Sequence, residues 1–97
     1  MNEELKTFIR TYLDLEQAYD TSGLRPTLMA FSESYVQAVR EGFSEVLQKR
    51  NLSLGEYEGM TGLEFPDIDS LYEYLQDMNA YLFEGRPDQP APPEDVS

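Results

Sequence analysis

The chain has 97 residues, which is enough for one domain of ordinary size. Seven Lys and Arg against nineteen Asp and Glu give a formal net charge of −12. This balance excludes a nucleic-acid binder that is held by clustered phosphate contacts, and it argues against docking on anionic lipid. The absence of Cys and His removes disulfides, thiolate chemistry, the commonest general base and the commonest metal ligand.

The composition also bears on location and folding. No apolar run approaches the roughly 20 residues of a membrane span, and the acidic start MNEE has no signal-peptide core, so we expect a cytoplasmic protein. Seven Tyr and five Phe predict a folded chain, because disordered chains are poor in aromatic residues. We predict an all-α fold, a small bundle of about four helices, with residues 1–85 as a single helical domain. The tail, residues 86–97, holds four of the six prolines, and we expect it to be disordered or extended and dispensable for folding.

The first predicted helix runs from Glu3 to about Tyr19, with Asn2 as N-cap and turn residues 20–23 after it. Its apolar residues recur at spacings of three and four: Leu5, Phe8, Ile9, Tyr12, Leu15 and Tyr19. Glu16 falls inside this stripe, where a carboxylate is costly to bury unless it is paired. Three interpretations stay open for Glu16: a binding carboxylate, a member of a buried polar network with a Tyr, an Arg or a helix N-terminus, or exposure by fraying.

The second predicted helix starts near Arg25–Pro26 and ends at Lys49–Arg50, where the cations favour a helix C-terminus. Its apolar stripe consists of Leu28, Phe31, Tyr35, Val39, Phe43 and Val46. The serines at positions 32 and 34 allow a break, with Ser34 as the cap of a restarted helix.

Two further helices are predicted in the second half. Ser53 and Glu56 fit a capping box at the start of a short helix over residues 53–60, and Gly59 and Gly62 are candidates for its C-cap. The last helix begins after Asp67 or Asp69 and ends before Gly85. Its apolar stripe is Leu71, Tyr74, Leu75, Met78 and Leu82.

The negative charge lies almost entirely in the second half of the chain. Residues 1–50 carry a net charge of −2, whereas residues 51–85 contain eight acids and no base. On the last helix, four acids share the face opposite the apolar stripe. One interpretation is a solvated face that maintains solubility. The other is a docking surface for a basic protein, such as a nuclease, whose candidate residues are Glu56, Tyr57, Glu58, Asp69, Tyr72, Glu73, Asp77 and Glu84.

No catalytic or metal-binding motif is present. The chain lacks G-x-S-x-G, a Gly-rich phosphate loop and H-E-x-x-H. Asp67-x-Asp69 begins like a calcium loop, but Tyr72 replaces the glycine at the sixth position and Met78 replaces the glutamate at the twelfth. We therefore expect no enzyme activity, no cofactor, no metal and no small-molecule substrate.

The order of these segments resembles a known family. The segments are an aromatic and acidic run in residues 11–20, a long helix through residues 39–47, a Leu-Ser-x-x-Glu segment at residues 52–56, and a last amphipathic helix with Leu71-Tyr-Glu-Tyr-Leu75. Over about residues 5–83 the chain resembles the small helical immunity proteins of bacterial contact-dependent growth inhibition systems. The resemblance implies a cytosolic protein that binds and neutralises a cognate toxin domain, often a nuclease.

Three hypotheses for function follow. The first is an immunity protein with an acidic docking surface for its toxin. The second is a nucleic-acid mimic that inhibits DNA- or RNA-processing proteins, and such a mimic is expected to bind several of them. The third is a small acidic adaptor or structural protein whose charge serves only solubility.

Overall fold

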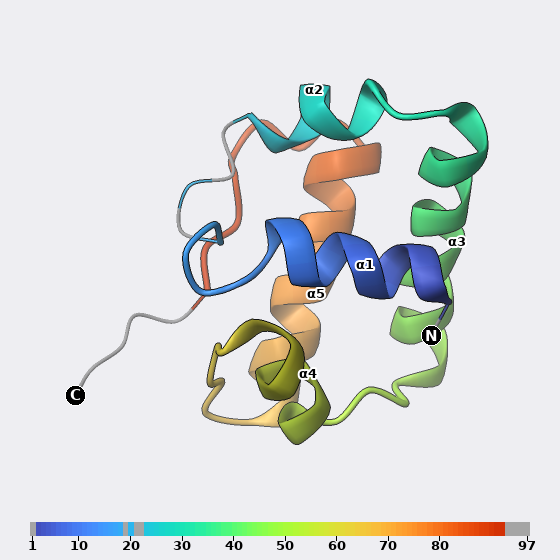
Figure 1. Cartoon of the computed structure of the whole chain (residues 1–97). Coiled ribbons are helices and arrows are strands. Elements are labelled where there is room, and N and C mark those ends of the chain that lie inside the picture. The colour runs from blue at the N-terminus through green and yellow to red at the C-terminus, as the bar shows by residue number, and fades with distance from the viewer. Residues whose placement is uncertain (1, 19, 21–22, 93–97) are drawn as a thin grey trace.

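The computed structural model describes residues 2–18, 20 and 23–92, and within them it confirms the predicted all-α class. Five helices replace the expected four, and no strand occurs in the described residues. Figure 1 shows their arrangement. The helices are α1 (Glu3–Tyr12), α2 (Leu24–Met29), α3 (Glu33–Lys49), α4 (Leu54–Thr61) and α5 (Ile68–Phe83).

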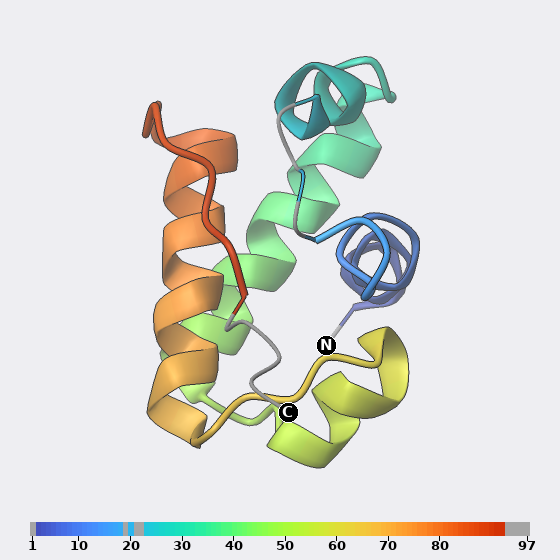
Figure 2. The same ribbon diagram turned by 90° about the vertical axis from the view of Figure 1, so that its left-hand side faces the viewer.

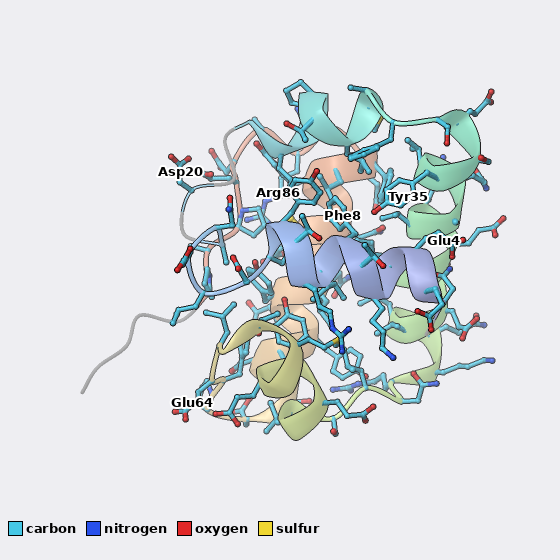
Figure 3. The ribbon with its side chains drawn as sticks, in the orientation of Figure 1. Glu4, Phe8, Asp20, Tyr35, Glu64 and Arg86 are labelled. Atoms are coloured by element: carbon cyan, nitrogen blue, oxygen red, sulfur yellow. The ribbon has the colours of Figure 1, made fainter. Side chains whose placement is uncertain are left out.

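One apolar core joins the five helices. Helix α1 packs across α3 and α4, α5 packs along α3, and α2 contacts the ends of both α3 and α5 (Figures 1 and 2). Phe8 of α1 is completely buried at the centre of this arrangement (Figure 3). Its ring lies 5.3 Å from that of Tyr12 and 6.5 Å from that of Phe43. These short helices are stable because each buries its apolar face against the others.

The close crossing of α1 and α3 depends on two residues, Asn2 and Gly42. Asn2 is the predicted N-cap of α1: its Oδ1 accepts the amide of Leu5 at 2.8 Å. Its Nδ2 donates to the carbonyl of Ala38 in α3, also at 2.8 Å. Gly42 of α3 is buried against Leu5, where a Cβ atom would lie only 2.8 Å from that of Leu5. The side-chain-free surface at Gly42 therefore allows the two helices to approach closely.

Helix α1 ends at Tyr12, seven residues before the predicted end. The amide of Leu15 donates to the carbonyl of Thr61 at the end of α4, at 2.8 Å, and the side chain of Asp14 accepts the amide of Gln17. These hydrogen bonds pair the backbone amides of Leu15 and Gln17 without a helix. The chain therefore leaves the helical path after Tyr12, and the side chains of Leu15 and Glu16 are exposed. The buried-network hypothesis for Glu16 is therefore wrong. Tyr19, Thr21 and Ser22, which belong to the predicted stripe and turn, lie outside the described residues.

The second predicted helix is two helices. The allowed break is present, but Ser32 caps α3, because its Oγ accepts the amide of Tyr35 at 3.3 Å. Phe31 lies in the corner between α2 and α3 and is 40% exposed, so its predicted place in the core is wrong. The corner interrupts the helical spacing on which that prediction depended.

Helices α4 and α5 have the predicted signals. Ser53 and Glu56 form both bonds of the capping box, and Gly62 ends α4 with a φ of 78°. Asp67 caps α5 by accepting the amide of Ser70 at 2.7 Å. Gly85 follows α5 with a φ of 79°, a left-handed conformation that glycine adopts without strain.

The described part of the tail, residues 86–92, has no helix or strand, as predicted, and runs back in the direction opposite to α5 (Figure 2). However, Pro90 and Pro92 are buried, so residues 86–92 contribute to the packed surface, which the high proline content did not indicate. The guanidinium of Arg25 in α2 donates to the carbonyl of Tyr81 and, at 2.6 Å, to that of Arg86. Arg25 thus fixes the start of the tail where α5 ends. Residues 93–97 lie outside the described part of the chain.

Candidate partner-binding groove

A shallow groove of about 420 Å³ runs between α3 and α5. Its wall on α5 begins near the N-terminus of the helix and extends to the C-cap, and its wall on α3 consists of the last turn and the C-cap. Its lining residues are Leu47, Arg50, Asp69, Tyr72, Glu73, Gln76, Asn79 and Glu84.

The groove is acidic. Asp69, Glu73 and Glu84 are exposed and line it, and Arg50 is the one basic residue of the lining. The amide of Asn79 donates to Oε2 of Glu84 at 3.1 Å, and this bond orients the Glu84 carboxylate. Three of the four acids that the sequence placed on one face of the last helix therefore line the same concave surface, spread along the length of α5. Concave acidic surfaces focus the electrostatic field and attract basic ligands.

Arg50 and Tyr72 occupy one end of the groove. Arg50 is the C-cap of α3 and has a left-handed φ of 50°. Its Nη2 lies 2.8 Å from Oδ1 of Asp69, and its guanidinium carbon lies 4.7 Å from the centroid of the Tyr72 ring. The Tyr72 hydroxyl accepts the amide of Leu52 at 2.8 Å and donates to its carbonyl at 3.0 Å. Tyr72 is only 5% exposed, so this candidate residue of the docking surface is a buried platform beneath Arg50 and offers a partner little direct contact.

Asp77 lies outside the groove lining. Its Oδ1 is 2.6 Å from Nη1 of Arg86, and the two side chains are both partly exposed. Arg86 follows α5 closely in sequence, so the tail supplies a counter-charge for this acid. Asp77 is therefore paired within the molecule and is separated from the groove acids of the same helix.

The three predicted residues on α4 do not join the groove. Glu56 accepts the amide of Ser53 in the capping box at 3.3 Å. Tyr57 is completely buried, which rules out its predicted role as an exposed anchor, and burial, with a smaller contribution from Tyr74, raises the pKa of its hydroxyl well above the usual value. Glu58 is exposed beside Glu64.

Glu58 and Glu64 form a second, smaller acidic feature. Figure 3 shows Glu64 beside α4, away from Arg86. A hydrogen bond between the two side chains, followed by their mutual repulsion, raises the pKa of Glu58 above its ordinary value of 4.5. The contact thus favours the protonated form of Glu58, because a protonated carboxyl can donate to its neighbour whereas two ionised carboxylates repel each other.

Four groove residues were absent from the sequence prediction: Leu47, Arg50, Gln76 and Asn79. The sequence identified Arg50 only as a cation that suits a helix C-terminus. Gln76 and Asn79 lie on the polar side of α5 between the acids, and they are uncharged, so the charge pattern did not mark them. The contact between α3 and α5 is needed to bring Leu47 and Arg50 beside them.

Other kinds of site find no support in the described part of the chain. Among residues 2–18, 20 and 23–92, no three acidic side chains are grouped so that they could hold a metal ion. No helix within those ranges combines the length and apolar character needed to cross a bilayer. Comparison of the chain with protein-family models, with curated proteins and with solved structures finds no match.

Proposed function

We propose that the protein is an immunity protein that binds a cognate toxin domain in the cytoplasm and neutralises it. The partner is a basic protein, a nuclease, and it docks on the groove between α3 and α5. The observation that carries this proposal is that Asp69, Glu73 and Glu84 line one groove together with a single basic residue, Arg50. The protein acts by binding, with no catalytic step of its own.

The charge arrangement supports inhibition in which the protein covers the substrate-binding surface of the toxin. The basic side chains with which a nuclease holds phosphates are the groups that would meet the groove carboxylates. Glu73 and Glu84 are exposed, so they can form such pairs without a rearrangement of the helix. Long-range attraction raises the association rate and weakens as salt shortens the Debye length. A toxin covered in this way loses access to its nucleic-acid substrate.

The proposal requires a basic nuclease domain encoded next to this gene, and the test pairs such a domain with wild-type protein and with the double variant Glu73→Lys/Glu84→Lys. We expect equimolar wild-type protein to abolish the nuclease activity of that domain. The double variant is expected to associate at least about tenfold more slowly at low salt, with a smaller difference at high salt. Stopped-flow fluorescence measures the rate. Asp77 is left unchanged because it is paired with Arg86.

The matched control is Glu41→Lys/Glu45→Lys, which makes the same change of charge at exposed positions of α3 outside the groove. If this control slows association as much as the groove variant, or if the wild-type rate does not depend on salt, the docking proposal is wrong. Similar affinity for several unrelated DNA-processing proteins would instead favour the nucleic-acid mimic.

A further inference from the structure

One end of the groove already holds a guanidinium group. Arg50 donates to the Asp69 carboxylate at 2.8 Å and stacks over the Tyr72 ring at 4.7 Å. A carboxylate beside an aromatic face is an arrangement that suits arginine better than lysine, because the guanidinium is planar and can pair and stack at the same time. The chain thus contains a guanidinium site whose present occupant is its own side chain.

The walls of this guanidinium site do not depend on Arg50. Tyr72 and Asp69 both belong to α5, and the Tyr72 hydroxyl is fixed by two hydrogen bonds to the backbone of Leu52. Removal of the Arg50 side chain therefore leaves the Tyr72 ring in place, with Asp69 still one turn before it on the same helix. A second guanidinium could take the same place.

Arg50 is held weakly. The side chains of Arg50 and Asp69 are 50% and 84% exposed, and ion pairs as exposed as this one contribute little to stability. The contact of the guanidinium with the Tyr72 ring is a cation–π interaction at a half-exposed side chain, and such interactions are also modest. An incoming guanidinium would regain both contacts, so displacement of the Arg50 side chain costs little.

We propose that Arg50 is an intramolecular occupant of the groove and that an arginine of the basic partner replaces it on binding. This inference rests on the proposed function, and it identifies the partner residue that enters next to Tyr72. The exposed carboxylates of Glu73 and Glu84 then receive further basic side chains of the same partner segment. The Arg50 contact therefore lowers the affinity for weakly basic proteins, which cannot compete with it.

The test compares two probes, N-acetyl hexa-arginine amide and N-acetyl hexalysine amide, by titration calorimetry at low salt. We expect Arg50→Gln to bind the arginine peptide at least about threefold more tightly than wild type, a change within the range of one exposed ion pair. The gain for the lysine peptide is expected to be smaller. Arg10→Gln, at an exposed position of α1, is the matched control for net charge, and we expect little change for either peptide.

If Arg50→Gln and Arg10→Gln increase the affinity for the arginine peptide equally, the increase comes from the change in net charge alone, and the inference is overturned. An unchanged or weaker affinity in Arg50→Gln, or no binding of the arginine peptide to any form, would also overturn it. Arg50→Asn is the second variant, since asparagine tolerates a left-handed backbone, and circular dichroism verifies that each variant is folded.

The variant Glu73→Lys/Glu84→Lys separates the two proposals. If it binds hexa-arginine as tightly as wild type, the groove is not the basic-ligand surface and the proposed function fails. If it loses binding while Arg50→Gln shows no increase in affinity, the groove is the surface that binds basic ligands, and only the proposed role of Arg50 is wrong.

Discussion

Gly42 shows how one residue determines the approach of two helices. A Cβ atom at this position would lie 2.8 Å from Cβ and 2.9 Å from Cδ2 of Leu5. Leu5 is buried in the core, so its Cβ atom cannot move without the backbone of α1. In an exposed helix, glycine is less stable than alanine, but here the packing reverses that preference.

We therefore predict that Gly42→Ala lowers the free energy of unfolding by about 1–3 kcal/mol. The control is Gly59→Ala in α4, where the added Cβ would meet nothing within 4 Å beyond the neighbouring residues and backbone of its own helix. That substitution is expected to raise the free energy of unfolding by roughly 0.5–1 kcal/mol, from helix propensity alone. Urea unfolding followed by circular dichroism measures both, and a stabilised Gly42→Ala would contradict the close packing at this crossing.

At the scale of the element, Glu58 of α4 and Glu64, which follows the helix, lie close enough together to make stability depend on pH. The contact with Glu64 raises the pKa of Glu58 in the folded state above its ordinary value of 4.5. Because this pKa is higher in the folded state than in the unfolded state, protonated Glu58 contributes favourably to the free energy of unfolding. That contribution is fully present below the pKa of the unfolded state and is lost as the pH rises through the pKa of the folded state. We predict that Glu58→Gln is more stable than wild type at about pH 7, and that this advantage disappears below about pH 4.5. Thermal unfolding across that pH range measures the difference.

Asp67 provides the opposite case as a control. Asp67 accepts hydrogen bonds from the backbone amide of Ser70, which has the larger effect, and from the Ser70 side chain. Both lower the pKa of Asp67 below its ordinary value of 3.8. The contribution of ionised Asp67 to the free energy of unfolding is therefore present above pH 3.8 and is lost as the pH falls through the pKa of the folded state. We expect Asp67→Asn to be less stable than wild type at neutral pH, and this difference in stability to become smaller in acid. Parallel pH profiles for the two variants would contradict the assignment of these two contacts.

At the scale of the whole molecule, the described part of the tail, residues 86–92, packs against the helices. Pro90 and Pro92 are buried, and Arg25 links α2 to the carbonyls of Tyr81 and Arg86. Arg86 in turn pairs with Asp77. We predict that truncation after Gly85 lowers the thermal midpoint by more than about 5 °C, which corresponds to about 1 kcal/mol for a chain of this size.

A chain that ends at Pro92 is the control for this truncation, because it keeps every described contact of the tail. We expect its thermal midpoint to equal that of the full chain. If truncation after Gly85 leaves the midpoint unchanged, the buried prolines contribute nothing to stability, and the original expectation of a dispensable tail is correct.

The sequence alone determined the features that depend on neighbouring residues. The caps at Asn2 and Ser53 and the glycine after α5 are local signals, because donor and acceptor lie within a few residues of each other. For the start of α5 and the end of α4 the sequence left two candidates each, and the structure selects Asp67 and Gly62. Helical periodicity similarly determined the all-α class and the apolar face of α5. The excess of acid in residues 51–85 is a property of composition that no fold can change.

The tertiary structure decided what depends on residues distant in sequence. Helix α1 ends early because the amide of Leu15 bonds to Thr61, and Tyr72 is a buried platform because Arg50 and Leu52 cover it. Charge pattern identified the acidic segment but not its division into the groove, the Glu58–Glu64 pair and the Asp77–Arg86 pair. That division follows from which helices pack together, and packing is set by apolar faces rather than by the charges that the packing brings together.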